Sequence, residues 1–122
     1  MSRKQQVMGT GTSAGAANMI VGSTASTLTA TGSTQADALQ LSADINEVTT
    51  VASSTGAILP ANCNIGDQIY VYSIGAQTLT VYPPVGETIN AIAAGSGFSV
   101  ATAKTATFTK VNNTRWASML TA

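Results

Sequence analysis

Few side chains in this 122-residue chain could carry chemistry. The sequence has no histidine and a single cysteine, Cys63. Without histidine, the Ser-His-Asp and Cys-His arrangements of hydrolases, an imidazole general base and a histidine zinc site are all excluded. A lone cysteine cannot form an intramolecular disulfide, so we interpret Cys63 as a small, partly buried apolar side chain.

The remaining candidates for acid–base chemistry are the five carboxylates Asp37, Asp44, Glu47, Asp67 and Glu87. A glycosidase needs two carboxylates that face one cleft at about 5 to 10 Å. Four of these five have a plainer role. Asp67 follows a glycine, where its side chain would hold a turn, and Glu87 falls in the "VGET" turn. Asp44 and Glu47 belong to what should be an exposed edge strand, where charge discourages unwanted pairing. We therefore predict a protein that is not an enzyme, with no cofactor and no metal site.

The most unusual property of the composition is its charge. Asp, Glu, Lys and Arg make up 8% of the chain, and the net charge is +0, whereas about 25% is typical of soluble domains. A compact monomer of this size would expose roughly 6,100 Å², or about one charge per 600 Å². This area per charge is as large as the largest exposed apolar patch on a typical monomer. We interpret the composition as that of a chain that assembles; the alternative is a surface kept hydrated by hydroxyl groups.

Charge and hydropathy also exclude some partners. The five basic residues are scattered, apart from Arg3 and Lys4, so the sequence lacks the basic cluster that binds nucleic acid. No run of about 18 apolar residues is present, so no membrane span is expected. The polar, glycine-containing start, "MSRKQQVMGTG", does not resemble the apolar region of a signal peptide.

The elements that must position any site begin after a polar segment. Residues 1–33 are small, polar and dotted with glycine, with one apolar island at Met19, Ile20 and Val21. Such a composition cannot bury enough side chain to offset the entropy of ordering. We therefore predict two parts, an extended N-terminal arm over residues 1–33 and a β-domain over residues 34–122.

Short β-rich pieces separated by turn residues fill the predicted domain. Leu41, Ile45 and Val48 also fit a helical spacing, but the density of Thr and Val nearby favours strand. The predicted strands cover residues 38–42, 45–51, 55–60, 68–74, 78–82, 88–92, 98–102, 105–111 and 115–120. Turn signals at intervals of about ten residues indicate an all-β fold, an antiparallel β-sandwich or barrel-like domain of about eight short strands. No fixed-length repeat is visible, which disfavours a solenoid.

The stretch "GDQIYVYSIGAQTLTVYPP", residues 66–84, is predicted to be a hairpin with "GAQ" as its turn. Large side chains alternate on both faces of its first strand, so we expect both faces to be covered. We predict that six aromatic residues lie in the core or at a subunit interface: Tyr70, Tyr72, Tyr82, Phe98, Phe108 and Trp116. The alternative is that the tyrosines and Trp116 form an aromatic platform for a sugar ring.

Three stretches, "INEVTTVASSTGAILP", "GDQIYVYSIGAQTLTVYPPVGETIN" and "ATFTKVNNTRW", give the chain a family resemblance. Over about two thirds of its length it resembles small β-domains encoded among the structural genes of tailed bacteriophages and prophages. The shared features are a strand ending in Leu-Pro, a Gly-Asp pair, "YPP", an "IN" element and a final aromatic strand. The matching residues, which we assign to folding, are Gly66, Asp67, Tyr82, Pro83, Pro84, Asn90 and Trp116.

The resemblance implies a virion structural protein, made in the host cytoplasm and located on the capsid exterior. The expected role is that of a capsid decoration, or cement, protein that binds the major capsid protein as a homotrimer. Related modules in head or tail fibres imply the alternative of a receptor- or glycan-binding module. Within the arm, the residues we expect to contact the capsid are Arg3, Lys4, Gln5, Gln6, Met19, Ile20 and Val21.

Overall fold

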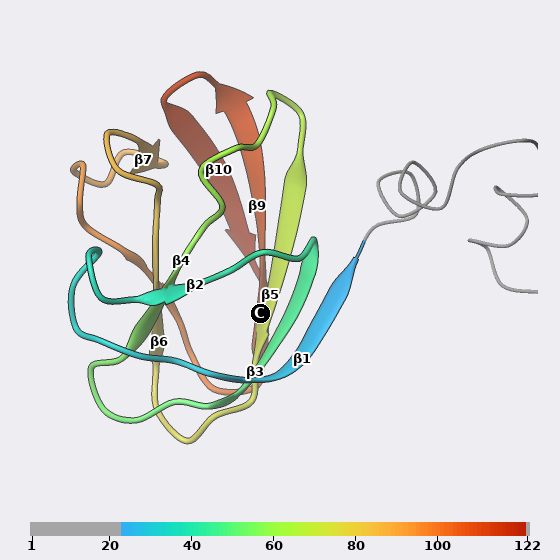
Figure 1. The fold of residues 1–122 in the computed structure, drawn as a ribbon, viewed down its shortest axis with the longest axis vertical. Helices are drawn as coiled ribbons and strands as arrows, with labels where there is room; N and C mark the ends of the chain where they lie inside the picture. Colours follow the sequence, from blue (N-terminus) through green and yellow to red (C-terminus); the bar gives the residue numbers. More distant parts are fainter. Residues whose placement is uncertain (1–22, 122) are drawn as a thin grey trace, which may run out of the picture.

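The computed structural model describes residues 23–121, and this part of the chain is all-β, without a helix. Its ten strands are β1 (Thr24–Thr29), β2 (Leu39–Gln40), β3 (Ile45–Thr50), β4 (Gly56–Ile58), β5 (Gln68–Ser73), β6 (Leu79–Tyr82), β7 (Thr88–Ile89), β8 (Phe98–Val100), β9 (Lys104–Asn112) and β10 (Arg115–Leu120). They form a six-stranded sheet in the order β1-β3-β5-β9-β10-β7 and a four-stranded sheet in the order β2-β4-β6-β8. Figure 1 shows the chain crossing repeatedly between the two sheets.

The first six strands stack like the coils of a solenoid. β1, β3 and β5 are parallel neighbours in one sheet, and β2, β4 and β6 are parallel neighbours in the other. Each coil therefore adds one strand to each sheet. The prediction of an antiparallel sandwich or barrel is wrong for this part of the chain, and the solenoid that the sequence disfavoured is closer to the observed path.

Unequal coil lengths explain why no repeat is visible in the sequence. Thr24 lies beside Ile45, 21 residues later, whereas Ile45 lies beside Tyr70, 25 residues later. In the other sheet, Leu39 lies beside Ala57, only 18 residues later. Because the loops absorb these differences, the strands stack without a constant period.

The predicted hairpin over residues 66–84 is also wrong. β5 pairs with β3 and β9, and β6 pairs with β4 and β8, so the two strands lie in different sheets. The turn between them passes close to the preceding coil: a Cβ at Gly75 would lie 2.6 Å from a Val51 methyl carbon. Both strands carry apolar inward residues, such as Val71 and Val81, which pack in one core. The alternation correctly predicts two strands, but it does not specify their pairing partners.

Antiparallel pairing is present in the later part of the chain. It joins β5 to β9, β9 to β10 and β6 to β8. The β9–β10 turn is held by the backbone N–H of Thr114, which donates to Asn112 Oδ1 at 2.9 Å. β7 is parallel to β10, with Trp116 beside Ile89. The fold thus combines a parallel coil stack with an antiparallel C-terminal part.

β1 lies within the segment predicted to be an extended arm. It pairs with β3, and the next residue, Ala30, is 4% exposed and belongs to the core. The backbone N–H of Ala30 donates to the Thr50 carbonyl at 2.9 Å. Residues 24–30 are thus part of the β-domain. The arm residues expected to contact a capsid, Arg3 to Gln6 and Met19 to Val21, lie outside the described residues.

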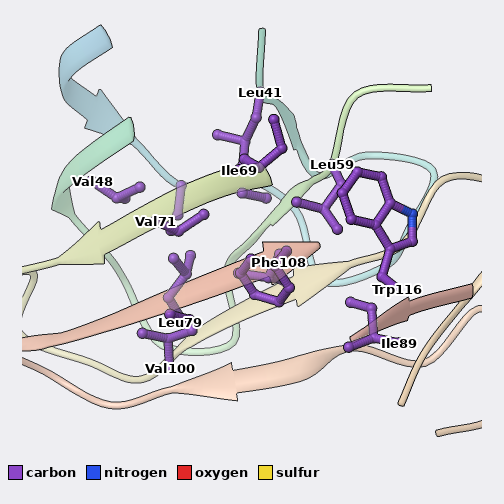
Figure 2. Close-up of a cluster of buried hydrophobic side chains, with 14 of the residues drawn as sticks. Leu41, Val48, Leu59, Ile69, Val71, Leu79, Ile89, Val100, Phe108 and Trp116 are labelled. Atoms are coloured by element: carbon purple, nitrogen blue, oxygen red, sulfur yellow. The ribbon is translucent and has the colours of Figure 1, made fainter. Parts of the chain in front are cut away.

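The core lies between the two sheets, where the inward-facing residues of both meet. Strand β5 shows the alternation directly, with Ile69, Val71 and Ser73 buried and the residues between them exposed. Figure 2 shows Phe108 among the aliphatic side chains of this core, with Trp116 beside Leu59. Phe108 also meets Phe98 edge to face, with ring centroids 5.7 Å apart. These contacts fix the six-stranded sheet on its inner side.

Candidate interaction surface

The six aromatic residues predicted for a core or an interface occupy different environments. Phe108 and Trp116 are fully buried, Tyr82 is 9% exposed, and Phe98 packs partly buried against the core. Tyr70 and Tyr72 instead point away from the core and remain 40% and 38% exposed. The structure does not gather the tyrosines and Trp116 into one aromatic platform.

Tyr70 and Tyr72 belong to a broad surface, which we call the outer face. It is the side of β3, β5, β9 and β10 that points away from the core, and no strand within residues 23–121 covers it. Strand alternation assigns to it Ile45, Glu47, Thr49, Gln68, Tyr70, Tyr72, Thr105, Thr107, Thr109, Val111, Arg115, Ala117 and Met119. The expectation that β5 is covered on both sides therefore fails for the chain alone.

The outer face collects most of the exposed apolar side chains. Nine large apolar residues within the described range are substantially exposed, and two of them, Ile65 and Val85, lie in loops elsewhere. Five of the others belong to the outer face, namely Ile45, Tyr70, Tyr72, Val111 and Met119, and the remaining two, Ile74 and Leu120, lie at strand ends. Scattered apolar residues need no explanation, but a cluster on one sheet face marks an interaction surface.

An open hollow of about 190 Å³ lies on this face. Its lining residues are Gln68, Thr107, Thr109, Ala117, Ser118 and Met119. They offer hydroxyl, amide and thioether groups, but no carboxylate, amine or thiol. The hollow can therefore accept a side chain or a neutral ligand, but it lacks a group that would act as a general acid or base.

Asp37, for which the sequence indicated no role, and Asp67, which was predicted to hold a turn, both bind the backbone of loops. Asp37 Oδ1 accepts hydrogen bonds from the Thr34 hydroxyl at 2.8 Å and the Thr34 backbone N–H at 2.9 Å. These bonds lower the pKa of Asp37 below its usual value. Asp67 Oδ2 accepts from the backbone N–H of Asn64 at 2.8 Å. Both groups are therefore engaged in shaping the backbone around them.

Asp44, just before β3, and Glu47, within it, do not protect an edge. β3 lies between β1 and β5, so the prediction that Asp44 and Glu47 belong to an exposed edge strand is wrong. Asp44 instead accepts from the backbone N–H of Ser23 at 3.3 Å and so helps to position the start of β1. Glu47 lies on the outer face beside Tyr72.

Sequence reasoning missed a nearly buried ion pair. Lys110 Nζ lies 3.2 Å from Glu87 Oε1, with side-chain exposures of 8% and 12%. The same carboxylate oxygen accepts from Trp116 Nε1 at 2.9 Å, and Lys110 Nζ lies 5.9 Å from the centre of the Trp116 ring. The cluster ties the loop after β6 to β9 and β10. A signal was available, because Lys110 follows Phe108 by two residues and must share its inward face.

Two residues that carry the family resemblance have clear conformational roles. Gly66 adopts a φ of 95° in a turn closed by the backbone N–H of Asp67, which donates to the Asn64 carbonyl at 3.0 Å. Asn90 adopts a φ of 53°, and its Nδ2 donates to Ser118 Oγ at 2.7 Å. Asparagine tolerates this left-handed conformation better than most residues. These contacts agree with the assignment of such residues to folding.

The last chemical candidate is the single cysteine. Cys63 is partly buried against the core, and this burial, followed by the charge of Asp67, raises the pKa of its thiol. Residues 23–121 contain no group of three or more His, Cys, Asp or Glu side chains that could hold a metal ion. The same part of the chain has no helix long and apolar enough to cross a membrane.

Comparisons with known proteins identify no relative. No protein-family model matches the chain, and neither the curated proteins nor the solved structures give a match. The outer face and the sequence pattern are therefore the features of the chain that bear on its function.

Proposed function

We propose that this protein is a virion structural protein, a capsid decoration or cement protein that binds the outside of an assembled phage shell as a homotrimer. The observation that carries the proposal is the outer face, where five of the nine exposed large apolar residues of the described chain gather on a sheet surface with few charges. A chain with +0 net charge meets no long-range repulsion when copies approach. The resemblance to phage structural β-domains supports the same role.

In this role the protein acts by binding and not by catalysis. A protein that binds the assembled shell but not its dissociated subunits stabilises the shell by mass action. Three copies held together engage several subunits of the major capsid protein at once, so weak individual contacts combine as avidity. The carboxylates support this view, because Asp37, Asp67 and Glu87 are engaged in turns or in an ion pair.

The test is co-sedimentation of the purified full chain with assembled shells that lack it, in parallel with dissociated capsid subunits and with host cells. We expect the protein to pellet with shells and to raise the temperature at which they break open. Its mass in solution should be three times 12.3 kDa, about 37 kDa. Failure to bind shells from any tailed phage related to its source would contradict the proposal.

The arm has a defined part in this proposal. Arg3 to Gln6 and Met19 to Val21 are proposed to contact the capsid or a neighbouring subunit. Deletion of residues 2–22 tests this while leaving β1 intact, because β1 begins at Thr24. We expect the shortened chain to keep its fold and lose most of its affinity for shells; unchanged shell binding would refute the assignment.

The hollow favours a second candidate, a receptor- or glycan-binding module of a phage fibre. Its neutral, hydroxyl-rich lining beside Tyr70 suits a sugar ring. This candidate predicts that the protein binds host cells or polysaccharide, and that Tyr70→Ala abolishes the binding without unfolding the domain. Sedimentation with cells but not with shells would select it.

A further inference from the structure

We infer that the outer face of the six-stranded sheet is the surface on which a second copy of this chain packs. The inference rests on the proposed function, because a homotrimer needs a contact between copies and the proposal alone does not locate it. Two other regions with exposed large apolar residues, at Ile65 and Val85, are single loop positions. The outer face spans four neighbouring strands.

The composition of the face matches the centre of a protein interface. Such centres are depleted of charge and enriched in Tyr and Met. The face carries Tyr70 and Tyr72 near its middle and Met119, which is 75% exposed, toward its other side. The central positions between them are threonines on β9. A β-branched threonine suits a strand and presents both a methyl group and a hydroxyl to a partner.

The face carries both a projecting part and a space to receive it. The register places Tyr70 beside Thr107, and Thr107 beside Met119, so the hollow lies between two projecting side chains. Its volume is about 190 Å³, and a cavity of about 150 Å³ holds one benzene molecule. One aromatic ring therefore fits. A second copy of the chain supplies such a ring from Tyr70 or Tyr72, so the tyrosine side of one outer face fits the hollow of the next in a head-to-tail contact that three copies can close into a ring.

The charges on the face also suit a second copy. Strand alternation places two charged residues there, Glu47 on β3 and Arg115 on β10, on opposite sides of the uncharged β5 and β9. Because their signs differ, two copies can pack without opposing like charges at the centre. A strongly acidic or basic partner would gain no net electrostatic attraction from this face, because the face carries one charge of each sign.

The size of the face sets the expected strength of the contact. Four strands spaced by about 4.8 Å, with six residues each rising about 3.3 Å, give a flat area of about 400 Å². Stable interfaces use about 800 Å² per partner. The contact alone is therefore modest, and association should depend on concentration over the micromolar range, strengthened where a third copy closes a ring.

The test compares the full-length protein with three variants by sedimentation equilibrium over a wide range of concentration. Tyr72→Lys and Thr107→Lys place a cation at the centre of the face, and Val85→Lys is the matched control at an exposed loop position. We expect each face variant to raise the dissociation constant about thirtyfold or more, which is typical of a hot-spot residue. The control should behave as the unmodified protein does. Fluorescence of the buried Trp116 reports whether each variant is folded.

Shell binding, measured on the same samples, separates this inference from the proposed function. Folded face variants that keep the mass of the unmodified protein overturn the inference, whether or not they still pellet with shells. If they keep the mass but lose shell binding, the face contacts the capsid instead. An unmodified protein that is monomeric at every concentration, yet binds shells, also overturns the inference and leaves the decoration role in place without the trimer. If one face variant fails to fold, the other decides the result.

Discussion

The inner and outer faces of the six-stranded sheet use the same strands in different ways. On β9, Ala106 and Phe108 are fully buried, whereas Thr107 and Thr109 between them face outward. On β5, Ile69 and Val71 are buried, whereas Tyr70 and Tyr72 stay partly exposed. A step of one residue thus separates a packed core from a surface left uncovered by the described chain.

This difference separates the residues that determine the stability of the fold from those that we expect to determine association between copies. Substitutions on the inner face remove packed contacts, so they should destabilise the fold whether or not copies associate. Substitutions on the outer face should weaken association and leave the isolated chain nearly unchanged. The unfolding measurements below are made at low protein concentration, because association would otherwise add to the apparent stability.

The largest effect is expected for Phe108→Ala. Phe108 is fully buried and meets Phe98 edge to face, so its truncation leaves a cavity in the centre of the core. Phe→Ala changes at such sites cost about 3 to 5 kcal/mol. Urea denaturation should show this loss, whereas the neighbouring outer-face change Thr107→Ala should alter the free energy of unfolding by no more than about 0.5 kcal/mol. Equal losses for the two variants would contradict the division between the faces.

A second large effect is expected for Glu87→Gln. This change keeps an acceptor for Trp116 Nε1 but leaves the ammonium group of Lys110 nearly buried without its counter-charge. Removing one partner of a buried ion pair costs about 3 to 5 kcal/mol, and we expect a loss at the lower end of this range, because both side chains keep some exposure. The double change Glu87→Gln with Lys110→Met removes the buried charge, so it should recover much of the stability in the same denaturation experiment. A double variant no more stable than Glu87→Gln would count against a charge effect.

Much of the local structure could be predicted from the sequence, but the pairing of strands could not. The Thr- and Val-rich stretch at residues 45–51 and the run at 105–111 correctly indicated β3 and β9. Alternation shows which side chains share a face, but it does not say whether the next strand pairs alongside or crosses to the other sheet. β5 and β6 therefore looked like a hairpin and instead lie in separate sheets.

The candidate surface was predictable only in part, for a similar reason. Low charge indicated a chain that assembles, but locating the surface requires the order of strands, which brings β3, β5, β9 and β10 side by side. The ion pair between Lys110 and Glu87 joins residues 23 positions apart and depends on the same pairing. The alternation of inward and outward residues on β9 predicts that Lys110 points inward, but no local pattern predicts that Glu87 is its partner.

A smaller effect on the fold is expected for Tyr70→Ala on the outer face. Its side chain is 40% exposed and contacts the neighbouring strands beside Ile45 and Thr107. Losing such cross-strand contacts costs about 0.2 to 1 kcal/mol, well below the effect of Phe108→Ala. Unfolding of the dilute protein should show this small loss, while association measured at higher concentration should weaken more than tenfold. A loss of stability as large as that of Phe108→Ala would show that the tyrosine belongs to the fold and not to the interface.

The smallest effect is expected for Ser73→Ala, although Ser73 lies on the inner face of the sheet. Ser73 is fully buried on β5, and its hydroxyl has no hydrogen-bond partner among the described residues. A buried polar group without a partner destabilises the fold by about 1 to 3 kcal/mol relative to a satisfied one. Ser73→Ala removes the hydroxyl with little change in volume, so it should leave stability unchanged or raise it by up to about 1 kcal/mol. Ser73→Val, which adds volume at the same packed position, should instead destabilise by about 1 to 3 kcal/mol. Thermal unfolding of the two variants distinguishes polarity from packing, because a clear loss in Ser73→Ala would mean that the hydroxyl makes a contact that stabilises the core.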